Sequence, residues 1–130
     1  MLLIDVGEEL QIIVERIIQE SLNGVPIIVE GKRDLEALRN IGVKGEIIIF
    51  KSLRELVDKL RILNAERVIL LMDMDREGED KTRHIKKFLE GIIEVDTAYW
   101  LKLYRYRYLG FTTIESFFKN IDKMVRKEWL

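Results

Sequence analysis

The sequence contains no cysteine, and only one of its 130 residues is proline. Without cysteine the chain forms no disulfide, no thiolate zinc site and no cysteine nucleophile, and this composition fits a reducing compartment. Long hydrophobic runs are also missing, because the longest uninterrupted apolar stretch, Val68 to Met72, is far too short to cross a bilayer. No secretory signal is found either. We therefore expect a cytoplasmic protein without membrane association.

An excess of charge of one sign is absent as well. Lys and Arg number 22 and Asp and Glu 23, which gives a formal net charge of -1. This balance argues against coating nucleic acid through bulk charge, so any phosphate-binding surface must come from a local arrangement of basic side chains. The hydrophobic fraction of 48% excludes disorder, and 130 residues is a usual length for one domain. We expect residues 1–130 to form a single domain.

Strand-like and helical segments alternate along the chain. A leading helix is expected over residues 5–22, with apolar side chains at helical spacing and a stop at Asn23-Gly24. Three nearly continuous apolar runs at residues 25–29, 46–50 and 67–72 are each followed by a helical pattern, and a weaker strand candidate covers residues 92–97. Continuous apolar runs are typical of parallel strands covered on both faces. The pattern predicts an α/β fold with an open parallel sheet of about four strands, helices on both faces, and a C-terminal helical extension at 98–130 that breaks near Gly110.

Acidic residues follow two of the predicted strands. Glu30 follows the first, and Asp73 and Asp75, two positions apart, follow the third, with Glu77 opening the next helix. Open α/β sheets place their sites beyond the carboxyl ends of strands, and carboxylate oxygens are ligands suited to Mg²⁺. For Glu30 to join the aspartates, the first and third strands must be neighbours. The sequence therefore predicts a strand order that contains 2-1-3.

This arrangement resembles a known family. Glu30-Gly31 after one strand and Asp-x-Asp at Asp73 and Asp75 after another are similar to the Toprim domain of topoisomerases, bacterial-type primases, OLD-type nucleases, recombination-mediator proteins and a ribonuclease that trims a ribosomal RNA precursor. The resemblance covers a core of residues 25–97. The acidic stretch 73–79 resembles that of type IA topoisomerases, whereas the stretch 29–34 is more like the ribosomal-RNA-trimming enzyme. Size and the helical extension resemble the stand-alone small Toprim proteins.

The resemblance implies roles for individual residues. Glu30 would act as general acid or base, and Asp73 and Asp75 would coordinate one or two Mg²⁺ ions, with Mn²⁺ as a substitute. Glu77 and Glu30 are the further candidate ligands. Gly31 and Gly78 are expected to allow close backbone approach to phosphate.

Basic residues near the acids are the candidates for holding nucleic acid. The helix after the acids is expected to turn Ile85, Phe88 and Leu89 inward and to expose its basic residues, which either track a phosphate backbone or simply form a solvated face. The expected nucleic-acid-binding residues are Lys32, Arg33, Arg76, Lys81, Arg83, Lys86, Lys87, Arg105 and Arg107. Asp34 is expected to cap a helix.

The conformation of the aromatic stretch at residues 99–108 has two possible interpretations. As a helix it would pack one face made by Trp100, Leu103, Tyr104 and Tyr108 against the sheet or the leading helix. As an extended segment it would align Tyr104, Tyr106 and Tyr108 as a stacking platform for single-stranded bases.

Two functions are compatible with these residues. The first is Mg²⁺-dependent phosphodiester chemistry on RNA or DNA, by a nuclease or a nucleotidyl-transfer enzyme, with RNA processing preferred because of the first motif. The second is a non-catalytic nucleic-acid-binding or assembly factor with a structural metal site. A protein partner that helps to hold the substrate is compatible with either. Topoisomerase activity is not expected, since that reaction needs a tyrosine nucleophile in a separate domain.

Overall fold

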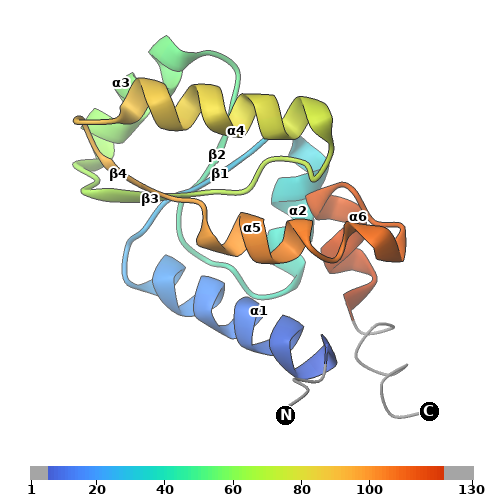
Figure 1. The fold of residues 1–130 in the computed structure, drawn as a ribbon. Helices are drawn as coiled ribbons and strands as arrows, with labels where there is room; N and C mark the ends of the chain where they lie inside the picture. The colour runs from blue at the N-terminus through green and yellow to red at the C-terminus, as the bar shows by residue number, and fades with distance from the viewer. Residues whose placement is uncertain (1–5, 122–130) are drawn as a thin grey trace, which may run out of the picture.

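The computed structural model describes residues 6–121, and its elements follow the alternation predicted from the sequence (Figure 1). The helices are α1 (Val6–Leu22), α2 (Lys32–Asn40), α3 (Leu53–Leu63), α4 (Arg76–Leu89), α5 (Ala98–Tyr104) and α6 (Ile114–Lys119). The strands are β1 (Ile27–Val29), β2 (Ile47–Ile49), β3 (Arg67–Leu70) and β4 (Glu94–Asp96). A short 3₁₀ turn, η1 (Arg107–Leu109), separates α5 from α6. In the described part, no helix is long and apolar enough to span a membrane.

The four strands form one parallel sheet in the order β2-β1-β3-β4. Strand β1 lies in the middle, and its Ile28 pairs with Ile48 of β2 on one side and with Leu70 of β3 on the other. The predicted order 2-1-3 is therefore confirmed. Because β1 and β3 are neighbours and run in the same direction, the residues that follow them meet at one edge of the sheet.

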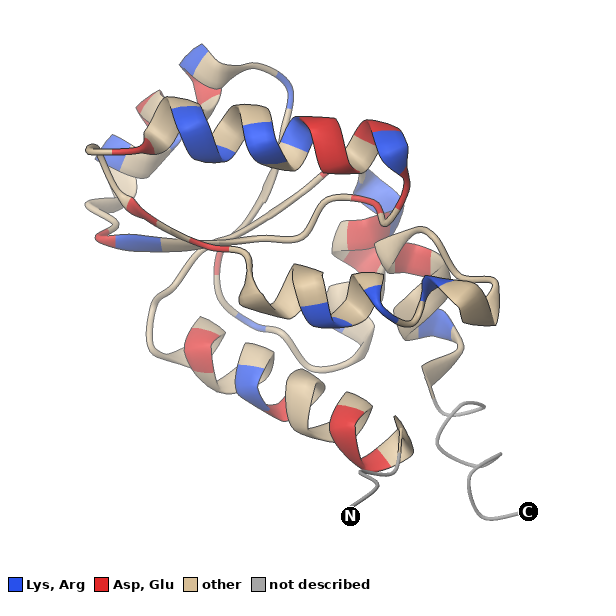
Figure 2. Cartoon of the chain, in the orientation of Figure 1, with Lys and Arg blue, Asp and Glu red and all other residues tan. Residues whose placement is uncertain are grey.

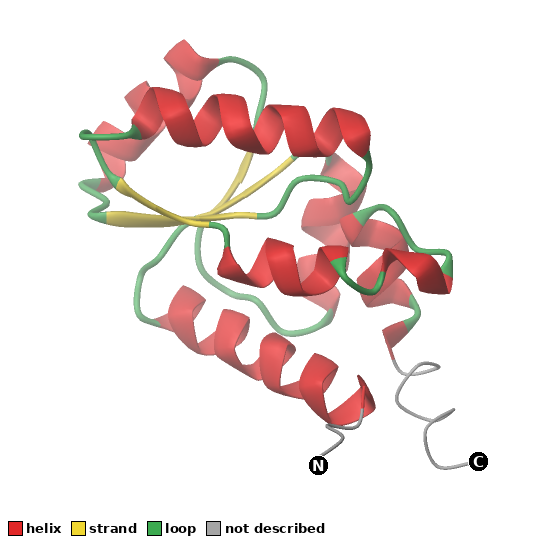
Figure 3. Ribbon diagram, in the orientation of Figure 1, coloured by secondary structure: helices red, strands yellow, loops and turns green. Residues whose placement is uncertain are grey.

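Helices cover both faces of the sheet, as predicted (Figure 3). Helices α3 and α4 lie over one face, while α1 and α5 lie over the other, with α2 and α6 packed together beside them (Figure 1). Strands β1, β2 and β3 are short and largely buried, in keeping with their continuous apolar sequence, whereas β4 at the edge of the sheet is partly exposed. The sheet forms the centre of the hydrophobic core, and its carboxyl edge opens toward α2, α4 and α6.

Local sequence explains where several helices begin. Ser52 accepts a hydrogen bond from the Glu55 N–H at the start of α3, and Thr113 accepts one from the Ser116 N–H at the start of α6. Both caps satisfy backbone donors that have no partner within their helix. The break predicted near Gly110 is confirmed, because Gly110 ends η1 with a φ of 98°.

Two side chains predicted to face inward are instead exposed. Phe88 is 45% exposed, because the buried stripe of α4 runs through Thr82, Ile85 and Leu89 and leaves Phe88 to one side. Tyr108 is 70% exposed, since α5 ends at Tyr104 and the helical spacing that would bury Tyr108 is not continued.

Candidate metal centre

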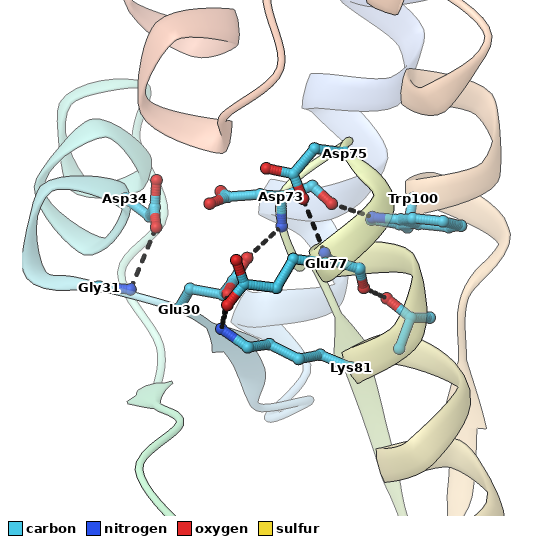
Figure 4. Close-up of polar contacts among 10 residues, drawn as sticks. Glu30, Gly31, Asp34, Asp73, Asp75, Glu77, Lys81 and Trp100 are labelled. Atoms are coloured by element: carbon cyan, nitrogen blue, oxygen red, sulfur yellow. Dashed lines mark hydrogen bonds and ion pairs between the residues drawn. The ribbon is translucent and has the colours of Figure 1, made fainter.

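The acidic residues that follow β1 and β3 converge at the carboxyl edge of the sheet (Figure 4). Glu30 comes directly after β1, and its Oε2 accepts a hydrogen bond of 2.8 Å from the backbone N–H of Asp73. Asp73 lies three residues past the end of β3, in the loop that leads to α4. The contact joins residues 43 positions apart in the sequence, so it depends on the pairing of β1 with β3.

Lys81 of α4 binds the other oxygen of Glu30. Its Nζ lies 2.5 Å from Glu30 Oε1 and 3.3 Å from Glu77 Oε1, so two carboxylates share one ammonium group. Burial alone would raise the pKa of Glu30, but the hydrogen bonds from Lys81 and from the Asp73 N–H hold this pKa below its ordinary value. Glu30 is therefore ionised at neutral pH, with both oxygens engaged.

Asp73 lies in the opposite electrostatic situation. Its Oδ1 is buried and has no hydrogen-bond partner among residues 6–121. Burial, followed by the repulsion of the neighbouring Glu30 carboxylate, raises the pKa of Asp73 to about 7. A buried acceptor without a partner destabilises the fold unless something else satisfies it. A cation bound to Asp73 would satisfy this oxygen and keep the carboxylate ionised.

Asp75 and Glu77 lie at the start of α4 and are exposed to solvent. The Oδ1 of Asp75 accepts a 2.7 Å hydrogen bond from the Gly78 N–H, so Asp75 is the N-cap of α4. Glu77 points toward Lys81 and shares its ammonium with Glu30 (Figure 4). Asp75 thus follows Asp73 by two residues, whereas Glu77 shares with Glu30 an ion pair to Lys81.

The two glycines of the motifs, Gly31 and Gly78, differ in how much space the structure leaves for a side chain. A Cβ on Gly78 would lie 1.9 Å from the carbonyl oxygen of Asp73, so the first turn of α4 packs directly on the backbone that carries the metal-ligand candidate. A Cβ on Gly31 would meet nothing closer than 3.8 Å, and its φ of -147° is open to any residue. Packing accounts for Gly78 without a ligand, and the phosphate role assigned to both glycines stays a prediction.

Asp34 does more than cap a helix. Its side chain accepts the Gly31 N–H at 3.1 Å, which is the predicted capping contact, and it also accepts the Glu115 N–H at the start of α6 at 2.9 Å. Burial raises the pKa of Asp34, against the effect of these two N–H donors. Sequence gave no signal for the second contact, because it joins residues 81 positions apart. Asp34 therefore fastens α6 to the loop that carries Glu30.

Two further contacts hold the Asp73 loop and were not anticipated. The indole N–H of Trp100 in α5 donates to the Asp73 carbonyl oxygen at 3.3 Å, and the backbone N–H of Met74 donates to the carbonyl oxygen of Thr112 at 2.6 Å. The helical interpretation of residues 99–108 predicts that Trp100 packs in the core, and its side chain is only 4% exposed. The segment after β4 thus supports the loop between β3 and α4.

The predicted basic residues do not form one surface. Lys81 faces the carboxylates, and Arg83 is paired with Glu79 and Asp80 at 3.7 and 3.0 Å. Lys86 lines a groove of about 250 Å³ between α4 and α5. Arg33 lines a separate cavity of about 450 Å³ with residues of α1, α2 and α6. The remaining candidates at exposed positions are Lys32, Arg76, Lys87 and Arg105.

The aromatic stacking platform that was predicted for an extended segment is not formed. Residues 98–104 are helical, Tyr104 donates its hydroxyl to Glu79 at 3.2 Å, and Tyr106 donates its hydroxyl to Glu9. Arg107 covers the Tyr104 ring, with its guanidinium carbon 3.9 Å from the ring centroid. Arg83 and Lys86 of α4 line the groove, opposite Trp100 and Leu101 of α5. Further basic positions occur along the α5–η1 segment (Figure 2).

The residues fit a single Mg²⁺ better than a larger metal cluster. Among residues 6–121, no group of three Asp, Glu, His or Cys side chains is arranged to hold a metal ion. Magnesium, however, is usually bound by one or two carboxylates together with waters and substrate phosphate. The partnerless Oδ1 of Asp73 and the adjoining carboxylate of Asp75 supply such a set.

Comparison with known proteins agrees with the fold. The sequence model of the Toprim domain matches residues 25–103, which include Glu30, Asp73 and Asp75. This chain belongs to the Toprim domain family. Toprim domains in general are associated with metal-dependent processes on nucleic acids, and they generally bind Mg²⁺.

Within that family the chain is similar to small archaeal proteins. It is 36% identical over 124 residues to the UPF0292 protein MJ1624 of Methanocaldococcus jannaschii, covering 93% of this chain and 91% of that protein. A UPF0292 protein of Thermococcus onnurineus is 45% identical over 65 residues, about half of each chain, 50% and 49%. A solved structure of a protein from Aquifex aeolicus aligns with a TM-score of 0.72 and 28% identity, covering 82% of this chain and 95% of that one.

Proposed function

We propose that this protein carries out Mg²⁺-dependent phosphodiester chemistry on nucleic acid, as a nuclease or a nucleotidyl-transfer enzyme. The observation that carries the proposal is the buried, partnerless Oδ1 of Asp73 beside an ionised Glu30, at the carboxyl ends of two adjacent strands. Such an arrangement offers a cation site and a proton acceptor side by side. We further propose that residues 1–130 act as one Toprim domain.

Asp73, with Asp75 beside it, would hold the metal ion. A bound Mg²⁺ offsets negative charge that develops on the phosphodiester oxygens and lowers the pKa of bound water. Glu30 is held in its ionised form by Lys81 and by the Asp73 N–H, so it is able to accept a proton from the attacking water or hydroxyl group. The bond from phosphorus to the attacking oxygen forms, the bond to the leaving oxygen breaks, and the proton returns from Glu30 to that leaving oxygen.

RNA is the preferred substrate within this proposal, because the stretch 29–34 resembles the first motif of the ribosomal-RNA-trimming enzyme. Lys32 and Arg76 support this proposal, because both are exposed in the first turns of α2 and α4 and follow Glu30 and Asp75 closely in the sequence. Backbone N–H groups at helix starts and nearby cations both favour phosphate. A protein partner that helps to hold the substrate remains part of the proposal.

A specific observation also supports the second function, a non-catalytic binding or assembly factor. Lys81 occupies Glu30 at 2.5 Å, and a general base that is tied to an ammonium group must be released before it takes a proton. In a binding factor this ion pair would simply hold the loop in place.

Incubation with structured and single-stranded RNA and DNA, with Mg²⁺ or with EDTA, separates the two functions. For the enzyme we expect cleavage or strand transfer that needs the metal and is lost in Glu30→Gln. Glu36→Gln, at an exposed position of α2, provides a variant with the same change of charge. Full activity in Glu30→Gln would remove the catalytic assignment. Retarded mobility of the nucleic acid without cleavage in every condition would favour the binding factor.

A further inference from the structure

Lys81 differs from the other basic residues of α4 in what it contacts. Its side chain runs back along the helix toward the N-terminus, as helical side chains do, and reaches the end of β1 (Figure 4). There its Nζ lies 2.5 Å from Glu30 Oε1 and 3.3 Å from Glu77 Oε1. Arg83 is paired with acids of its own helix, and Lys87 is exposed. Lys81 alone among the three reaches the carboxyl edge of the sheet.

The ammonium group is paired with Glu30 and Glu77, two of the four acids that the sequence predicts as metal ligands. In two-metal phosphodiester sites the ions lie about 3.5–4 Å apart and share neighbouring carboxylates. Here Glu30 and Glu77 already share one cation, and the second oxygen of Glu30 accepts the Asp73 N–H. A divalent ion at Glu30 would meet a positive charge at close range, which opposes its binding.

The Asp73 side of the site is arranged differently. Its buried Oδ1 has no partner within the described residues, and Lys81 makes its ion pairs with Glu30 and Glu77 instead. On the Glu30 side, the carboxylates are compensated by the Lys81 ammonium group. On the Asp73 side, a buried carboxylate oxygen is left for a ligand.

We propose that the Lys81 ammonium replaces a second metal ion beside Glu30 and Glu77, so that the centre takes a single divalent cation, on the Asp73 side. This inference rests on the proposed function, because it presupposes that the centre binds a divalent metal. It makes Lys81 a positioning residue that holds Glu30 and sets the number of metal ions. It also removes Glu30 and Glu77 from the set of direct metal ligands in the wild-type chain.

Counting bound Mn²⁺ tests the proposal without any activity measurement. We expect the full chain, titrated with Mn²⁺ and followed by electron paramagnetic resonance of the free ion, to bind one ion. Lys81→Met frees Glu30 and Glu77 and should bind two ions, since removing the opposing charge should strengthen binding at the second position on the order of tenfold. Lys81→Arg keeps the positive charge and should stay at one ion.

Two further variants complete the test. Lys59→Met removes one positive charge from an exposed position of α3, and should leave the count at one. The double variant Lys81→Met/Glu30→Gln should lose the second ion again, which assigns that ion to Glu30. Urea unfolding of each variant checks that the fold is retained.

The outcomes distinguish the two proposals. Two Mn²⁺ ions in the wild-type chain, or one ion in Lys81→Met, would overturn the role given to Lys81 and leave metal-dependent chemistry standing. No bound ion in either protein would overturn both.

Discussion

The two sides of the carboxylate centre lie next to each other and are built in opposite ways. Glu30 is ionised and has both oxygens engaged, by Lys81 and by the Asp73 N–H. Asp73 has a buried oxygen without a partner in the described chain, and its pKa is raised to about 7. The hydrogen bonds of Glu30 are all made within the protein. Burial of the partnerless Asp73 oxygen destabilises the fold, and a bound cation would remove this destabilisation. Neighbouring acids of the same motif therefore need not share one role.

The two sides are also anchored by different parts of the chain. Asp34 joins the Glu30 loop to α6, while Gly78 and Trp100 pack against the backbone of Asp73 from α4 and α5. Both anchors on the Asp73 side lie on helices that border β3 and β4. The hydrogen bond from the Asp73 N–H to Glu30 Oε2 is a contact that joins the two sides.

The largest effect is expected from the glycine on the Asp73 side. Gly78→Ala places a methyl group 1.9 Å from the Asp73 carbonyl oxygen, so either α4 or the loop must move. We expect a loss of about 3 kcal/mol in the free energy of unfolding, measured by urea denaturation. Gly31→Ala, on the Glu30 side, should cost about 0.5 kcal/mol or less, since its Cβ meets no close atom. Equal losses in the two variants would contradict the contrast between the two loops.

The next largest effect is a dependence of the free energy of unfolding on pH through Asp73. The pKa of Asp73 is raised from 3.8 to about 7, so between these values the folded chain binds a proton that the unfolded chain has released. Stability contributed by this proton is present at low pH and is lost as the pH rises toward 7. Because the side chain is partly exposed, we discount the full shift and expect a loss of about 2 kcal/mol.

The measurement compares wild type with Asp73→Asn in EDTA. Relative to the wild type, the variant should gain stability between pH 4.5 and pH 7.5 in urea unfolding, because an amide does not ionise. Adding Mg²⁺ at pH 7.5 should recover stability in the wild type and not in the variant. A difference between the two proteins that does not change with pH would show that Asp73 is ionised normally, and would remove the contrast with Glu30.

The smallest effect is expected at the anchor of the Glu30 side. Asp34→Asn keeps one acceptor oxygen and turns an NH₂ group toward a second N–H donor, so either Gly31 or Glu115 loses its hydrogen bond. We expect a loss of about 1 kcal/mol, with faster hydrogen exchange at the Glu115 amide. Asp58→Asn, exposed on α3, is the control. Unchanged exchange at Glu115 would mean that α6 is held by other contacts.

The pattern of short apolar runs and helical segments was enough to predict the parallel sheet and the neighbouring positions of β1 and β3. Parallel strands buried on both faces leave a signal in the local sequence, and the acids at their ends gave a reason for the strand order. The same pattern failed for Phe88 and Tyr108, because small rotations of a helix, or its early end, change which side chains are buried.

For the candidate centre, sequence identified the acids and tertiary structure separated their environments. Lys81 was predicted on an outer basic face, since its spacing of four from Glu77 indicates a pair on one helix and gives no information about Glu30. The link from Asp34 to α6 and the support of Asp73 by Trp100 also join distant parts of the chain. Such contacts follow from the packing of helices on the sheet, which no local pattern records.

By itself, the sequence determined the fold class, the strand order and the residues that meet at the carboxyl edge of the sheet. Tertiary structure decided which of those carboxylates is neutralised and which is left open. The reason is physical: burial and the distance to the nearest cation set the charge state of a carboxylate, and both are properties of the folded chain.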